Sequence, residues 1–113
     1  MEKQTLQTFK EYSEDKFTKR IIFNKGDSTV FVLNFMLGQE LPEHTHPSTE
    51  VYLLVLEGEG TFIIDGKETA VTANDVVHCG SEERLAFKNS GENPVSLYVM
   101  LNKIPNENYA KNI

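Results

Sequence analysis

The sequence predicts an all-β domain, and three observations lead to this fold class. Short runs rich in β-branched and aromatic residues recur from residue 28 onward, and turns containing Gly, Asn or Pro separate them. In the run "PVSLYVML" (Pro94–Leu101), four aliphatic side chains recur with the period of two expected of a strand. Helical periodicity is weak and confined to Leu6–Tyr12. Such a series favours a β-sandwich or a β-barrel.

The expected strands follow one another at short intervals. They are Ser28–Leu37, Glu50–Leu56, Thr61–Asp65, Lys67–Val71, Asp75–Cys79, Arg84–Asn89 and Pro94–Leu101. The dipeptide Asp65-Gly66 predicts a tight hairpin, because a type I′ turn needs positive φ at both central positions. The strand Glu50–Leu56 is apolar on both faces, so one face should line the interior and the other should meet a second sheet or a second subunit.

The chain of 113 residues is expected to form one domain, residues 1–113, with a barrel over about 28–102. An N-terminal extension precedes the barrel, and the short polar tail "NKIPNENYAKNI" follows it. The N-terminus has no signal-peptide pattern, and the longest aliphatic run, "VYLLVL", is too short to span a bilayer. The single cysteine, Cys79, cannot form an intramolecular disulfide and suits a reducing compartment. These features predict a cytoplasmic protein.

Charge is distributed unevenly around a net value of −6. Residues 38–92 carry three basic and eleven acidic side chains, a net of −8. An acidic body repels phosphate groups, so nucleic acid and anionic membranes are poor partners. The same acidity would tolerate a cation, although it also serves solubility alone.

The stretch "GQELPEHTHPSTE" contains the candidate site. His44 and His46 would present both imidazoles to one face if the segment is extended, and the flanking prolines favour an extended backbone before them. Glu50 adds a carboxylate. Two imidazoles and one carboxylate suit a divalent transition metal such as Fe, Mn, Ni, Cu or Zn. The alternative is a solvent-exposed histidine pair with no metal.

This stretch resembles the first motif of the cupin superfamily, which is a glycine, five residues, H-x-H, three or four residues, a glutamate, six residues and a glycine. The matching positions are Gly38, His44, His46, Glu50 and Gly58, with seven residues instead of six before the last glycine. The segment "VYLLVLEGEGTFIIDG" is also similar to cupin sequences. The resemblance covers about residues 30–101 and implies a double-stranded β-helix (jelly-roll) barrel that assembles as a homodimer.

The second cupin motif is matched in length by "NDVVHCGSEERLAFKN", but only Asn89 agrees in identity. Leu85 stands where metal-binding cupins supply a further histidine ligand. Three outcomes remain open. His44, His46 and Glu50 bind a metal alone, His78 joins them as an additional ligand, or the metal site has degenerated to an apolar pocket.

Tyr52, Leu85 and Phe87 are the candidate pocket-lining residues, although Phe87 also suits the core. The resemblance implies a small-molecule ligand or substrate. It leaves two function classes open, a metal-dependent enzyme of dioxygenase, isomerase or decarboxylase type and a non-catalytic module that binds or senses a small ligand. The catalytic residues are not identifiable from the sequence.

Overall fold

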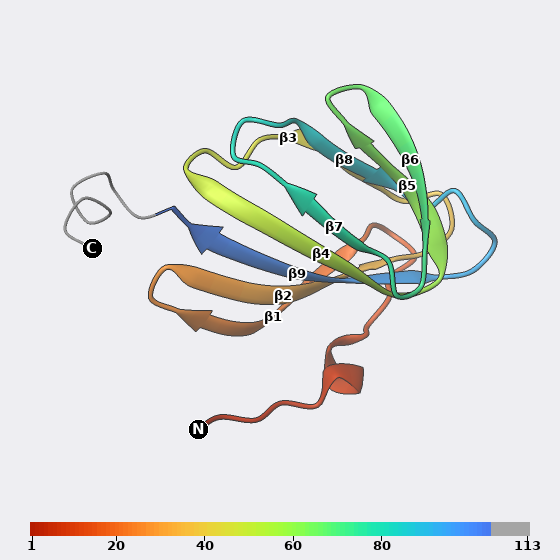
Figure 1. Ribbon diagram of the computed structural model, residues 1–113. Helices are drawn as coiled ribbons and strands as arrows, with labels where there is room; N and C mark the ends of the chain where they lie inside the picture. The colour runs from red at the N-terminus through yellow and green to blue at the C-terminus, as the bar shows by residue number, and fades with distance from the viewer. Residues whose placement is uncertain (105–113) are drawn as a thin grey trace.

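The structure is a computed structural model that describes residues 1–104. Within these residues the chain forms one short 3₁₀ helix and a series of strands (Figure 1). In chain order the elements are η1 (Leu6–Phe9), β1 (Thr18–Lys25), β2 (Ser28–Phe35), β3 (Glu40–His44), β4 (Thr49–Glu57), β5 (Glu59–Ile64), β6 (Lys67–Thr72), β7 (Val76–Cys79), β8 (Leu85–Lys88) and β9 (Val95–Lys103).

The strands form two antiparallel sheets that face each other (Figure 1). One sheet has the order β1-β2-β9-β4-β7 and the other β3-β8-β5-β6. Neighbours in a sheet are mostly distant in sequence, because the chain crosses repeatedly from one sheet to the other. This is the jelly-roll arrangement, and it confirms the expected all-β double-stranded β-helix.

The hydrophobic core fills the space between the sheets. From β4, the side chains of Val51, Leu53 and Val55 point inward and are at most 1% exposed. From the smaller sheet, Phe87 packs against Phe62 with ring centroids 4.8 Å apart, and it reaches Phe35 of the larger sheet at 5.0 Å. Aromatic contacts therefore tie the two sheets together.

Two tight turns depend on the ability of glycine to adopt positive φ. Asp65 and Gly66 have φ values of 52° and 79° between β5 and β6, which confirms the predicted hairpin. Gly58 has φ +84°, and a Cβ built on it would lie 2.4 Å from the carbonyl oxygen of Pro94. A side chain at residue 58 would therefore require a strained backbone, and it would also displace Pro94, which directly precedes β9.

The barrel begins earlier than residue 28. Strand β1 was not expected, because "TKRIIFNK" carries charged residues and lacks clear alternation, yet it pairs with β2 along its length. The weak helical pattern near Leu6–Tyr12 corresponds to the single turn η1. The predicted polar tail lies outside the described residues from residue 105 onward.

The N-terminal segment lies over the outer face of the larger sheet and is anchored by polar contacts. The Asn34 side chain is fully buried, donates to the carbonyl of Phe9 at 2.9 Å, and accepts from the Ser96 hydroxyl at 2.7 Å. Tyr12 contacts the same serine hydroxyl at 2.6 Å. These bonds satisfy groups that would otherwise be buried without partners. Within residues 1–104, no helix has the length and apolar composition needed to cross a membrane.

Candidate ligand cavity

A cavity of about 160 Å³ lies between the two sheets, and we call it the barrel cavity. Its walls are mostly aliphatic and aromatic. Its lining consists of Phe17, Lys19, Phe31, Leu33, Leu41, His44, His46, Val51, Leu53, Leu85, Val99 and Leu101. Three of these side chains are polar, and two of them are the histidines of the first sequence motif.

His44 is the last residue of β3 and lies opposite Leu85 of β8 in the ladder. Its Nδ1 is 2.7 Å from the carbonyl oxygen of Pro42. Because a carbonyl oxygen can only accept, Nδ1 carries the proton and donates it. The Nε2 atom of a neutral His44 ring therefore retains its lone pair.

His46 lies just after β3, and its ring meets that of His44 edge to face, with centroids 4.4 Å apart. Its Nδ1 is buried and has no hydrogen-bond partner within the described residues. Burial lowers the pKa of His46, and the neighbouring His44 and Lys19 lower it further. The neutral ring is therefore favoured, and its buried Nδ1 remains without a partner among the described residues.

Glu50 does not face the barrel cavity. Side chains alternate along β4, and Val51 points inward, so Glu50 points outward. Its Oε2 lies 2.6 Å from Nε2 of His78 on the neighbouring strand β7. Among residues 1–104, no group of three or more His, Cys, Asp or Glu side chains is placed to hold a metal ion.

The other candidate residues divide between the two faces. Leu85 is buried and lines the barrel cavity. Tyr52 and His78 lie together on the outer face with ring centroids 5.2 Å apart, so the expected pocket-lining role of Tyr52 does not apply to this cavity. Phe87 packs in the aromatic core; it does not line the barrel cavity, but it lines a second, larger hollow beside β3.

Lys19 was absent from the sequence-based candidates. It lies on β1, opposite Leu33 of β2, and its Nζ stands 4.4 Å from the centroid of the Phe31 ring. This cation–π contact aligns the side chain with the wall of the barrel cavity. Only the pairing of an unexpected strand reveals this position, because no local motif marks the residue.

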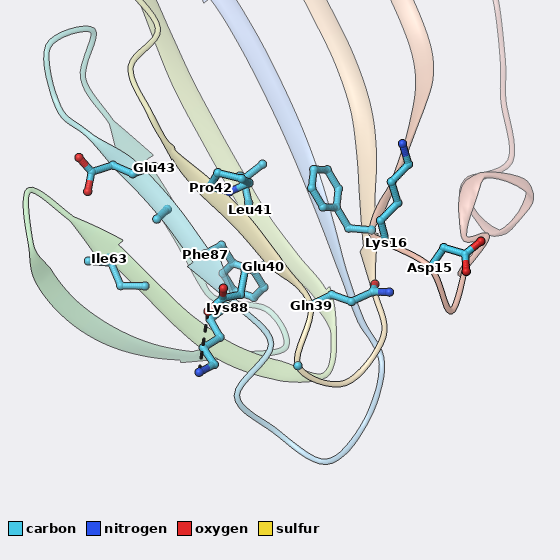
Figure 2. A pocket seen from close by; sticks show the side chains of 13 residues that line it. Asp15, Lys16, Gln39, Glu40, Leu41, Pro42, Glu43, Ile63, Phe87 and Lys88 are labelled. Atoms are coloured by element: carbon cyan, nitrogen blue, oxygen red, sulfur yellow. Dashed lines mark ion pairs between the residues drawn. The ribbon is translucent and has the colours of Figure 1, made fainter.

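A larger groove of about 470 Å³ runs along edge strand β3 (Figure 2). Its rim carries charges of both signs, including the pair Glu40 and Lys88, whose oxygen and nitrogen are 3.8 Å apart. Phe17 and Leu41 line both the groove and the barrel cavity. These two side chains therefore form a shared wall between the two hollows.

The donor set of the barrel cavity fits a firmly held metal poorly. Protein sites for catalytic metals commonly supply three ligands, and here two imidazoles are present. The residue opposite His44 in the β3–β8 ladder is Leu85, which cannot ligate. Lys19 places a positive charge on the same cavity. The expected set of His44, His46 and Glu50 is divided between opposite faces of the barrel wall.

Solved structures resemble the chain over nearly its whole length. The TT1209 protein from Thermus thermophilus matches with a TM-score of 0.86 and 20% identity over 93% of this chain and 100% of that one. An uncharacterised protein with a double-stranded β-helix domain from Klebsiella pneumoniae matches with a TM-score of 0.85 and 21% identity, covering 91% and 90% of the two chains. At these identities the likeness concerns the fold.

A third similar structure is the cupin domain of an XRE family transcriptional regulator from Enterobacter cloacae. Its TM-score is 0.72 at 18% identity, covering 79% of this chain and 98% of that one. No curated protein sequence matches the chain. The family model described as "Cupin domain" matches residues 31–101, which is more than half of the sequence. The chain therefore belongs to the cupin family.

Proposed function

We propose that this cupin binds a small organic molecule in the barrel cavity and does so without a firmly held metal. The observation that carries the proposal is the opposite orientation of neighbouring residues on β4. Val51 faces the cavity, and Glu50 faces away from it to contact His78. Without Glu50, the barrel cavity has a mostly apolar lining with a few polar groups, which is the usual composition of a small-ligand site.

The size of the cavity limits the ligand. A protein cavity of about 150 Å³ lined by aliphatic and aromatic side chains accommodates benzene. The barrel cavity has about 160 Å³ and a similar lining. A ligand body of roughly six to ten non-hydrogen atoms therefore fits, with any polar group directed to the histidines.

The proposal is tested by calorimetric titration of metal-free protein, dialysed against EDTA, with three aromatic probes of similar size, namely benzoate, benzamide and benzylamine. At least one probe should bind. Leu101→Trp, at a half-buried lining position, should abolish this binding by filling the cavity, whereas Leu54→Trp on the outer face of β4 should not. Failure of all three probes to bind, or equal loss in both variants, would contradict the proposal.

Metal binding by His44 and His46 is a second candidate, and one observation favours it. His44 Nδ1 donates a hydrogen bond to the Pro42 carbonyl oxygen, which fixes the orientation of the ring and leaves Nε2 available to bind a metal. Metal-ligating histidines are commonly oriented by such a bond from their other nitrogen. Iron, manganese, nickel, copper and zinc are the metals considered. Elemental analysis of untagged protein tests this candidate: a stoichiometric metal that is lost in the His44→Ala/His46→Ala double variant would support it.

We also propose a homodimer that uses the outer face of the larger sheet. On this face Tyr52 is 39% exposed and Val76 is 71% exposed, beside the half-buried Leu54, Tyr98 and Met100. A monomer would leave these apolar side chains in contact with water. Sedimentation analysis should give a dimer for the native chain and a monomer for Val76→Glu; a native monomer would contradict the assembly.

A further inference from the structure

The three polar residues that line the barrel cavity lie near one another and are more exposed than the innermost part of its aliphatic wall. Lys19 is exposed and the two histidines are half-buried, whereas Leu53 and Leu85 in the aliphatic wall are 1% exposed. We call the group formed by Lys19, His44 and His46 the cavity mouth. A ligand that enters would therefore meet the polar groups with one end and the aliphatic wall with the other.

The charge at the cavity mouth is positive in a protein whose net charge is −6. Within residues 1–104, no carboxylate lies at ion-pair distance from Lys19, whereas Arg20 and Lys25 on the same strand pair with Glu11 and Glu2. The charged neighbours that act on His46 are His44 and Lys19, and neither is an acid. The mouth therefore presents a cation with no anion supplied by the described chain.

His46 adds a second polar group at the same place, because its ring lines the barrel cavity. Its Nδ1 is buried and closed to an entering ligand, so the nitrogen that the ring offers to the cavity is Nε2. A ligand atom that forms a hydrogen bond with Nε2 gains binding free energy. A neutral imidazole can donate to an anionic oxygen from either nitrogen, according to its tautomer.

We propose that the ligand of the barrel cavity is a small organic anion, with an apolar body against the aliphatic wall and an acidic group, such as a carboxylate, at the Lys19 ammonium and Nε2 of His46. This inference rests on the proposed ligand-binding function. An ammonium ligand would be repelled by Lys19, and a neutral ligand would forgo the charge-assisted bonds that an anion makes there. The proposed class of ligand for the barrel cavity is therefore limited to organic acids with a compact apolar body.

The test compares the three probes of similar size on metal-free protein. Benzoate should bind about tenfold or more tightly than benzamide, as expected for one charge-assisted hydrogen bond, and benzylamine should bind most weakly. Lys19→Met should reduce the affinity for benzoate by about tenfold and leave that for benzamide unchanged. Lys25→Met, which removes the same charge at an exposed end of β1, should leave both affinities unchanged.

The outcomes separate this inference from the function on which it rests. The inference that the ligand is an anion is wrong if benzamide binds as tightly as benzoate, or if Lys19→Met reduces the affinity for both probes equally. The proposed ligand-binding function would stand in either case. If Lys25→Met reduces the affinity for benzoate as much as Lys19→Met does, the preference for anions arises from the overall charge of the protein. The assignment of the anion site to the cavity mouth would then be wrong. If no probe binds, the proposed function fails and the inference fails with it.

Discussion

Glu50 and His78 contact each other on the outer face of the barrel, with Oε2 and Nε2 2.6 Å apart. The contact joins β4 to β7, two strands paired in the larger sheet. It occupies the carboxylate that the sequence suggests as a metal ligand. The motif is therefore divided, with His44 and His46 at the barrel cavity and Glu50 on the outer face of β4.

Glu50→Gln should therefore leave the barrel cavity unaffected. The side chains of Glu50 and His78 are 34% and 51% exposed, and even a fully charged pair with this exposure contributes only about 0.2–1 kcal/mol. We expect unchanged benzoate affinity and a loss in the free energy of unfolding of at most about 1 kcal/mol, measured by urea denaturation. A large loss of benzoate affinity would show that Glu50 belongs to the ligand site.

Leu85→His should create metal binding where the native chain has little. Residue 85 lies directly opposite His44 in the β3–β8 ladder, at a distance where cross-strand side chains interact. We expect Co²⁺ to bind about tenfold more tightly than to the native chain, a gain of about 1.4 kcal/mol. Thermal shift with Co²⁺ measures the effect.

The matched control for this substitution is Ala86→His, which places the new histidine on the opposite face of the same strand. It should not alter Co²⁺ binding. If the native chain already binds Co²⁺ as tightly as Leu85→His, then His44 and His46 form a sufficient site, and the second candidate function replaces the first.

Cys79 should be unreactive in the folded protein. Burial, with a smaller effect from nearby carboxylates, raises the pKa of its thiol to about 11. At pH 8 the thiol should react with an aromatic disulfide reagent far more slowly in native protein than in urea-unfolded protein. Rapid labelling of the native state would contradict the buried position.

The same shift predicts a loss of stability in alkali. Between the ordinary thiol pKa of 9.0 and the raised value of about 11, the folded state keeps a proton that the unfolded state has released. The free energy of unfolding should therefore fall as pH rises through this window. In Cys79→Ser, the part of the fall that comes from the thiol should disappear.

Gly58→Ala should destabilise the barrel. The residue has φ +84°, and the added Cβ would meet the Pro94 carbonyl oxygen at 2.4 Å and Val95 at 2.7 Å. We expect a cost of about 2–4 kcal/mol in the free energy of unfolding. Gly80→Ala is the matched control, since its nearest contact is the Glu83 side chain at 3.3 Å. Equal effects in the two variants would contradict a special role for residue 58.

Most strands from Ser28 onward were predictable because their apolar residues and turn residues report local structure directly; β3 (Glu40–His44) was not among the expected strands. The hairpin at Asp65-Gly66 was predictable for the same reason, since its backbone conformation depends on two residues. Strand β1 was not, because its stability comes from pairing with β2 and not from its own composition. The predicted cytoplasmic location remains a prediction.

The site was only partly predictable. The spacing of His44, His46 and Glu50 shows which residues are close in sequence, but the face that each one occupies depends on the strand register. The β4–β9 ladder is irregular between Val55 and Glu57, next to the segment that has one residue more than the cupin pattern. A difference of one residue reverses the face of every side chain on one side of it, so Glu50 lies outside and Val51 inside.

Methyl NMR of EDTA-treated protein titrated with benzoate tests ligand binding in the barrel cavity most directly. If benzoate binds there, the methyl signals of Leu33, Leu53 and Leu85 in the barrel cavity should shift, and those of Leu37 and Leu54, which lie outside it, should not. Shifts that require an added metal ion, or that are as large at Leu54 as at Leu53, would contradict metal-independent binding of a small organic ligand inside the barrel.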